Sequence, residues 1–292
     1  MYTVNNFING KSDSTSSKSS KIINPSYGVD IGEVLYASKE SANLAIDAAS
    51  DAFKTWSKTG MSYRAELILK FRQEVINKSA EIIDICTKEA GKTKPDAEAE
   101  LDRAIQALTH ASGIQHFYPA HISRNVAGNI DIADMRYPIG VVAGVGPFNF
   151  PILIPILHSS MALVTGNTYI AKPSEKVPSI SRLYADIYKD IGLPDGCYNV
   201  INGGKDIVEY IVSHQKVDGL AFIGSTNAAR SLKALGVKSN TKVQALGGGK
   251  NHMIVLPDAD LDMAADAAVS ASFGAAGQRC MAVSVVVAVG DI

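Results

Sequence analysis

The stretch Val141-Val142-Ala143-Gly144-Val145-Gly146-Pro147-Phe148-Asn149 decides the fold, because a wholly apolar run leads directly into a turn. An apolar run of this length bounded by Gly and Pro is typical of a buried strand. Strand and helix then alternate with short connections. Strands are expected at 141–145, 169–172, 198–201, 219–223 and 242–245, and helices at 152–164, 179–191, 207–213 and after 226. Such repeats predict an α/β fold with a doubly wound parallel sheet, covered by helices on both faces.

The carboxyl ends of these strands are where a ligand would bind in such a sheet. The strand ends carry glycine and polar residues, at 146–149, 172–175, 203–204, 224–225 and 247–249. Gly224-Ser225-Thr226 opens a helix, so its backbone N–H groups suit a phosphate, although this sequence is also an ordinary helix N-cap. The chain lacks the usual Gly-x-Gly-x-x-Gly pattern at this turn. Lys172 and Glu175 could contact ribose hydroxyls, or could form a solvated pair on a loop.

Two side chains suggest chemistry at the same edge. Asn149 is a polar amide between Phe148 and Phe150, so it should have a specific partner. Its NH₂ group could stabilise an oxyanion, or it could tie down the loop. Cys280 follows Gly277-Gln278-Arg279, between a helical run at 261–272 and an apolar strand at 282–289. A thiol on such a turn suits covalent catalysis, but it could also be a structural cysteine at a helix end.

The segments before residue 140 are mainly helical. A strand at 7–8 meets an Asn9-Gly10 turn, and helices are expected from 41, from 62 to 90 with Gly91 as its stop, and from Pro95. Residues 118–137 contain an alternating stretch typical of a half-exposed strand pair. Such a ribbon is only marginally stable alone, so we expect it to lean on a partner subunit or on an intrachain neighbour.

Composition excludes several classes of protein. The 292 residues are 46% hydrophobic and 20% charged, with a net charge of −1, so bulk charge would not recruit nucleic acid or a membrane surface. Cys86, Cys197 and Cys280 have no metal-like spacing, which argues against zinc and against a disulfide framework. The first residues do not resemble a signal peptide, and no apolar run has membrane-spanning length. A cytoplasmic setting is expected.

The whole chain resembles the aldehyde dehydrogenase superfamily. The resemblance is carried by five motifs in order: Gly146-Pro147-Phe148-Asn149-Phe150-Pro151, Lys172-Pro173-Ser174-Glu175, Leu193-Pro194-Asp195-Gly196, Phe222-Ile223-Gly224-Ser225-Thr226 and Gly277-Gln278-Arg279-Cys280. It implies a Rossmann-like cofactor domain at 1–117 and 138–246, a protruding oligomerisation ribbon at 118–137, and the opening of a second α/β catalytic domain at 247–292. A homo-oligomer, dimer or tetramer, is implied for the full-length protein.

The resemblance also implies roles for single residues. Cys280 would attack a small-molecule aldehyde, Asn149 and the Cys280 backbone N–H would hold the oxyanion, and hydride would pass to NAD, leaving a thioester. Arg103 and Arg279 would hold a substrate carboxylate; alternatively, Arg103 is a surface helix charge and Arg279 belongs to a structural pair. The positions expected to line the dinucleotide are Gly146, Phe148, Lys172, Glu175, Lys176, Ser225 and Gly247.

One departure from the superfamily pattern narrows the reaction. Hydrolytic members carry Glu-Leu-Gly-Gly-Lys, whose Glu activates water, but aligning on Lys250 puts Leu246 at that position. The surrounding sequence resembles that of methylmalonate-semialdehyde dehydrogenases, which implies that coenzyme A releases the acyl group. Relatives continue well past the nucleophile, so we expect this chain to be an N-terminal portion. The alternatives are a hydrolytic aldehyde dehydrogenase and a non-catalytic remnant that binds dinucleotide.

Overall fold

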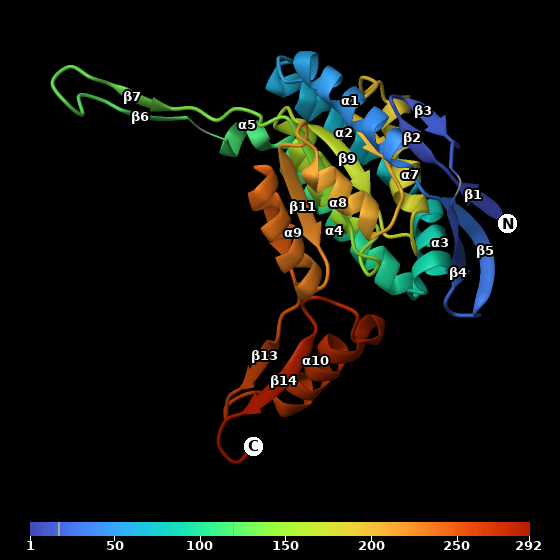
Figure 1. Cartoon of the computed structure of the whole chain (residues 1–292). Coiled ribbons are helices and arrows are strands. Elements are labelled where there is room, and N and C mark those ends of the chain that lie inside the picture. The colour runs from blue at the N-terminus through green and yellow to red at the C-terminus, as the bar shows by residue number, and fades with distance from the viewer. Residues whose placement is uncertain (17, 119) are drawn as a thin grey trace.

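The computed structural model describes residues 1–16, 18–118 and 120–292. A large α/β body is followed by a small C-terminal α/β unit, and a thin ribbon projects from the body (Figure 1). Pro119 of the predicted ribbon lies outside the described residues.

The body is built on a seven-stranded sheet. Its strands, in spatial order, are β12 (Lys242–Leu246), β11 (Gly219–Ile223), β8 (Val141–Val145), β9 (Thr168–Lys172), β10 (Tyr198–Val200), β2 (Asn6–Ile8) and β3 (Lys11–Asp13). The first five pair in parallel, which confirms the predicted doubly wound sheet. From β8 the chain goes on to β9 on one side and later returns to β11 on the other. The topological switch point, where a ligand crevice is expected, therefore lies between β8 and β11.

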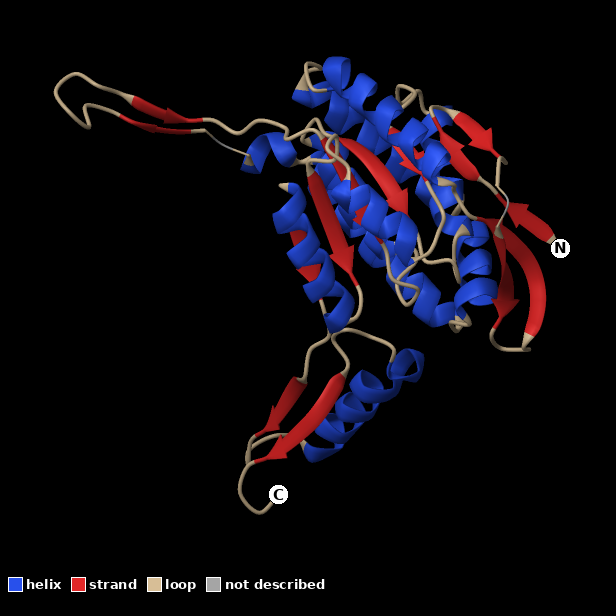
Figure 2. Ribbon diagram, viewed as in Figure 1, coloured by secondary structure: helices blue, strands red, loops and turns tan. Residues whose placement is uncertain are grey.

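Helices cover both faces of the sheet, as Figure 2 shows. One face packs against α1 (Lys39–Trp56), α8 (Lys205–Ser213) and α9 (Thr226–Ser239). The other face contacts α6 (Leu153–Val164) and α7 (Ser179–Asp190), and α2 (Met61–Asn77), α3 (Ser79–Ala90) and α4 (Lys94–Ser112) pack with these two helices in the same core. Neighbouring residues of β9 show the strand period of two: Tyr169 belongs to the second face and Ile170 to the first. Both side chains are fully buried, so the sheet separates two cores.

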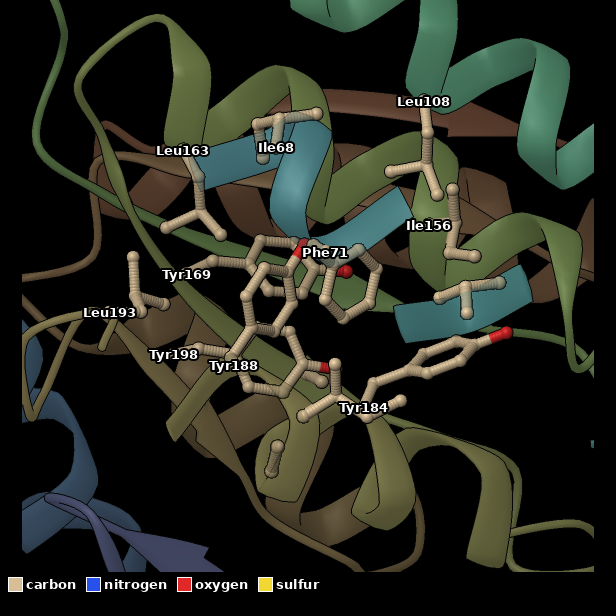
Figure 3. Close-up of a cluster of buried hydrophobic side chains, with 14 of the residues drawn as sticks. Ile68, Phe71, Leu108, Ile156, Leu163, Tyr169, Tyr184, Tyr188, Leu193 and Tyr198 are labelled. Carbon is tan, nitrogen blue, oxygen red and sulfur yellow. The ribbon is translucent and has the colours of Figure 1, made fainter. Parts of the chain in front are cut away.

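Aromatic side chains fill much of the core beneath β9 and β10 (Figure 3). Phe71 stacks on Tyr188 with ring centroids 3.8 Å apart. A Cβ at Gly144 would lie 1.8 Å from the Tyr169 hydroxyl, so a glycine at this position of β8 makes room for that ring. Burial of this kind supplies most of the stability that fixes the strand ends.

The predicted helix 62–90 is wrong in one respect, because it is two helices. The chain breaks at Lys78, where φ is −96° and ψ is 15°. The break redirects α3 so that Ile82 and Cys86 reach the core. Gly91 ends α3 with φ of 68°, as predicted.

The N-terminal strands add to the body. The Asn9-Gly10 turn has φ of 49° and 75°, as expected for a tight hairpin, and joins β2 to β3. β2 then pairs antiparallel with β10, an extension of the sheet that the sequence did not indicate. A separate sheet contains β1 (Tyr2–Val4), β5 (Val29–Leu35) and β4 (Ser19–Asn24).

The ribbon leaves the body after the short helix α5 (Ile114–Phe117). It pairs β6 (His121–Ser123) with β7 (Ile132–Asp134), and every residue of both strands is exposed. The strands are shorter than the predicted alternating stretch, because Asn125 and Asn129 adopt positive φ in the connecting turn. In Figures 1 and 2 the ribbon extends away from the body, with no neighbouring element beside it.

The C-terminal unit is one parallel βαβ motif. It comprises β13 (Asn251–Val255), α10 (Leu261–Phe273), the 3₁₀ turn η1 (Gly274–Gly277) and β14 (Val283–Ala288). No residue of α10 is buried. Among the described residues, no helix combines the length and apolarity needed to cross a membrane.

Candidate active site

A cavity of about 510 Å³ opens at the carboxyl ends of β8, β9 and β11. It lies at the switch point of the sheet, where Gly146 and Gly224 leave β8 and β11. The C-terminal unit closes the opposite wall. Nine of the residues predicted from the sequence line this one cavity: Gly146, Phe148, Asn149, Lys172, Glu175, Ser225, Gly247, Arg279 and Cys280. Lys176 and Arg103 do not line it.

The pair at the end of β9 is only partly solvated. Lys172 Nζ lies 3.4 Å from Glu175 Oε2, and the lysine side chain is 7% exposed whereas the glutamate is 40% exposed. Burial lowers the pKa of Lys172, and the Glu175 carboxylate opposes this shift. The buried Lys172 ammonium can donate hydrogen bonds and the more exposed Glu175 carboxylate can accept them. The pair therefore suits two vicinal hydroxyls of a ligand.

The start of α9 provides backbone donors. The Ser225 hydroxyl accepts a hydrogen bond of 3.3 Å from the Ala228 N–H and so caps the helix. The remaining N–H groups of the first turn have no intrahelical acceptor, which suits an anion. A Cβ at Gly247 would lie 2.9 Å from the Thr226 Cα, so this glycine allows the chain after β12 to pass close to the helix end.

A second cavity of about 480 Å³ continues from the first between α8 and α9. Both cavities contain Lys172, Glu175 and Phe222, while Val208 and Leu232 give the second one apolar walls. Such a slot suits a flat, weakly polar ring system. This slot was not predicted from the sequence. The available signal was the apolar face of each helix, since Val208 and Leu232 lie on those faces and also line the cavity.

Asn149 bridges the two walls of the first cavity. Its Nδ2 donates a 2.8 Å hydrogen bond to the backbone oxygen of Gln278. The side chain therefore ties the loop after β8 to the turn that carries Cys280, and a second N–H remains on the amide. On the same loop, the ring of Phe148 lies 4.8 Å from Lys176 Nζ, so Lys176 packs behind the cavity wall.

The turn before Cys280 has an unusual backbone. Ala275, Ala276 and Gly277 all have positive φ, of 52°, 54° and 72°. Two alanines in this region are uncommon and mark a strained segment. The Asn251 amide holds the far side of the turn, donating 2.9 Å and 3.0 Å hydrogen bonds to the Cys280 and Ala282 oxygens. This role of Asn251 was not predicted from the sequence.

The three cysteines differ in exposure. Cys280 is exposed, whereas Cys86 and Cys197 are buried and burial raises the pKa of each thiol to about 12. Because the thiolate is the nucleophile, the two buried thiols are poor candidates at neutral pH.

The two arginines have different environments. Arg279 Nη2 lies 2.5 Å from Asp96 Oδ1, which is the structural pair considered above. Arg103 is exposed on α4 and donates a 3.0 Å hydrogen bond to Gln106. Within the described parts of the chain, no cluster of His, Cys, Asp or Glu could hold a metal ion.

Comparison with known proteins agrees with this architecture. The profile of the aldehyde dehydrogenase family matches residues 12–292. A malonate-semialdehyde dehydrogenase of Pseudomonas aeruginosa is 41% identical over 291 residues, covering 100% of this chain and 59% of the relative. A second malonate-semialdehyde dehydrogenase, from Lacticaseibacillus casei, is 40% identical over 98% of this chain and 58% of its own length.

Solved structures agree with the sequence matches. A methylmalonate-semialdehyde dehydrogenase of Oceanimonas doudoroffii superimposes with a TM-score of 0.96 at 39% identity, covering 100% of this chain and 60% of that one. A protein of Sinorhizobium meliloti 1021, described under the same enzyme name and complexed with NAD, gives 0.96 at 38% identity with the same coverage. The chain thus spans about 60% of the length of these relatives. It belongs to the aldehyde dehydrogenase family.

Proposed function

We propose that this chain contributes the cofactor site and the nucleophile of an NAD-dependent dehydrogenase for malonate- or methylmalonate-semialdehyde, with coenzyme A as the acyl acceptor. The observation that carries the proposal is that Cys280 lines the same cavity as Lys172, Glu175 and Ser225. A nucleophile and a dinucleotide site must meet in this way if hydride is to leave a carbon bonded to the thiol sulfur.

The cavity walls fit a dinucleotide in three places. Lys172 and Glu175 offer a donor and an acceptor to ribose hydroxyls, the first turn of α9 offers N–H groups to the pyrophosphate, and the apolar slot between α8 and α9 suits adenine. Phe148 and Gly146 line the cavity beside Asn149, and Lys176 supports Phe148 from behind. NAD, when bound, supplies the hydride acceptor.

The covalent steps fall to Cys280 and Asn149. The Cys280 thiolate attacks the aldehyde carbon, and the carbonyl oxygen takes the electron pair. The free N–H of the Asn149 amide and the Cys280 backbone N–H stabilise that oxygen. The bond to Gln278 orients the amide, so its NH₂ group faces the nucleophile turn. Loss of hydride from the carbon restores the carbonyl group and leaves a thioester on Cys280.

Release of the acyl group is assigned to coenzyme A because the described residues that line the cavity offer no free carboxylate to activate water. Glu175 is the only carboxylate among the described residues that line it, and it is paired with Lys172. Leu246 occupies the position where hydrolytic relatives carry Glu. A thiol needs less help than water, since its own pKa is much closer to neutrality.

The substrate carboxylate is assigned to Arg279 and Arg103. Arg279 precedes the nucleophile, and Arg103 lies about 10.5 Å along α4 from Asp96, two turns away on the same face. Guanidinium groups suit a carboxylate because they offer paired N–H donors.

The domain and assembly assignments are part of the same proposal. Residues 1–117 and 138–246 bind the cofactor, residues 247–292 begin the catalytic domain, and residues 118–137 form an arm between subunits of a dimer or tetramer. The arm projects with Ile122, Ile130 and Ile132 exposed, which favours a covering partner. A cytoplasmic setting agrees with three free cysteines.

The test is NADH formation from malonate semialdehyde with and without coenzyme A. We expect a single-turnover burst without coenzyme A and steady turnover with it. Fast steady turnover in water alone would support the hydrolytic alternative and reject the coenzyme A step. NAD binding with no burst and no covalent adduct on Cys280 would support a non-catalytic role for this chain.

A further inference from the structure

The ion pair between Asp96 and Arg279 joins two distant parts of the chain. Asp96 lies in the first turn of α4, and Arg279 belongs to the turn before the nucleophile. The closest atoms, Nη2 and Oδ1, are 2.5 Å apart, and the side chains are 28% (Arg279) and 23% (Asp96) exposed. A pair with this much burial is screened less than a surface pair, so it constrains the guanidinium.

Both partners are held in place by their surroundings. The Thr93 hydroxyl donates to Asp96 Oδ2 at 3.1 Å and accepts from the Asp96 N–H at 3.3 Å. The Arg279 guanidinium lies across Gly274, where a Cβ would come within 2.6 Å of Nη1. Gly274 has ordinary φ and ψ of −53° and 135°, so a side chain at this position would displace the Arg279 guanidinium and would not strain the backbone.

The pair also lies between two cavities. Arg279 lines the 510 Å³ cavity together with Cys280, and Asp96 lines a neighbouring cavity of about 390 Å³. Asn149 and Gln278 line both. The carboxylate of Asp96 is therefore bound to the residue next to the nucleophile, beside the proposed oxyanion site.

We propose that Asp96 determines the preference of the Cys280 site for anionic reagents by occupying Arg279 in place of a substrate carboxylate. The inference rests on the proposed function, since it takes Arg279 as the carboxylate-binding residue. Asp96 and an incoming carboxylate have the same chemistry and the same sign of charge. They compete for the same N–H donors of the guanidinium, so Asp96 weakens the binding of an anionic substrate until it is displaced.

Alkylation of Cys280 tests this competition without any turnover. Iodoacetate carries a carboxylate and iodoacetamide is its neutral analogue, so the ratio of their rates measures the preference for an anion and cancels changes in thiol reactivity. In Asp96→Asn the ratio of the iodoacetate rate to the iodoacetamide rate should rise about three- to tenfold. This is the effect expected when a carboxylate no longer neutralises the Arg279 charge in a partly hydrated site. Asp102→Asn is the matched control, because Asp102 is an exposed carboxylate on the same helix. Its ratio should stay at the wild-type value.

Two further variants separate competition from simple repulsion by Asp96. In an Arg279→Gln background, Asp96→Asn should change the ratio much less than in the native background. Asp96→Glu keeps the charge and should restore the wild-type ratio. The proposal is overturned if Asp96→Asn matches Asp102→Asn, if its ratio falls, or if the same rise survives in Arg279→Gln. Because alkylation needs no NADH formation, these outcomes are distinct from failure of the dehydrogenase assay.

Discussion

The side-chain nitrogen of Asn149 lies 2.8 Å from the backbone oxygen of Gln278, two residues before Cys280. One hydrogen bond thus connects the loop after β8 to the turn that carries Cys280. Since Asn251 holds the other side of that turn, Cys280 is fixed between two asparagine side chains from different parts of the chain. The thiol can be exposed and still keep a defined position.

The first prediction concerns the three thiols. With one equivalent of iodoacetamide at neutral pH, mass spectrometry should find the label on Cys280, because Cys86 and Cys197 are buried with raised pKa. Cys280→Ala should abolish labelling and leave NAD affinity nearly unchanged. Cys86→Ala should lower the free energy of unfolding by about 1–3 kcal/mol and leave labelling intact. Equal labelling of Cys197 in the folded protein would contradict the assignment.

The second prediction concerns the dinucleotide. Glu175 should favour NAD over NADP, because its carboxylate accepts from ribose hydroxyls and repels a 2′-phosphate. Calorimetric titration should show at least about tenfold tighter binding of NAD, and Glu175→Gln should reduce that preference several-fold. Glu66→Gln, an exposed carboxylate on α2, serves as the control and should preserve it. Equal affinity for both dinucleotides in the native chain would reject this role.

The third prediction concerns a buried ion pair behind the Asn149 loop. Lys92 Nζ lies 2.6 Å from Glu100 Oε2, and both side chains are almost fully buried. Glu100 Oε1 also accepts from the Ile152 and Leu153 N–H groups at the start of α6. Glu100→Gln leaves the lysine charge unpaired and should reduce the free energy of unfolding by about 3–5 kcal/mol in urea.

Two companion variants test that explanation. Adding Lys92→Met to Glu100→Gln removes the unpaired charge and should recover part of the loss. Glu98→Gln removes an exposed carboxylate from the same helix and should change stability by less than about 0.5 kcal/mol. A double variant as unstable as the sum of the single variants would show that the pairing itself is unimportant.

The fourth prediction concerns pH. Burial lowers the pKa of His158 from 6.5 to about 4. Because the unfolded chain binds the His158 proton more readily, the contribution of His158 to the free energy of unfolding is fully present above about pH 6.5. It falls as the pH drops toward 4. The slope is at most about 1.4 kcal/mol per pH unit. His158→Gln should flatten the curve of urea midpoints between these pH values, whereas His121→Asn on the exposed ribbon should not. An unchanged curve in His158→Gln would exclude His158 as the source.

The parallel strands were predictable because each buried strand is visible in the sequence as its own run of apolar residues. β8 and β11 match the predicted ranges residue for residue, since each is an apolar run ended by glycine. The gathering of Lys172, Ser225 and Asn149 then followed from the rule that parallel strands end at one edge. Their detailed contacts needed the structure.

Other features had no local signal. The apolar spacing of α2 continues into α3, so the break at Lys78 is visible only once both helices pack. Pairing of β2 with β10 joins segments almost 200 residues apart. The partners of Arg279 and Asn251 are likewise set by tertiary approach, since no residue pattern links Asp96 to a turn 183 positions away.

The lack of buried residues in α10 has a consequence for hydrogen exchange. The amides of β8 and β9 lie between the two buried cores, so they should exchange only when the whole α/β body unfolds. The helical amides of α10 are bonded, but no buried side chain holds the helix against a core. They should exchange through a local opening of much lower free energy. The turn that carries Cys280 follows α10 directly, so one side of it is attached to a helix without a buried residue. Its other side is tied through Asn149 to the loop after β8, one of the strands expected to exchange most slowly.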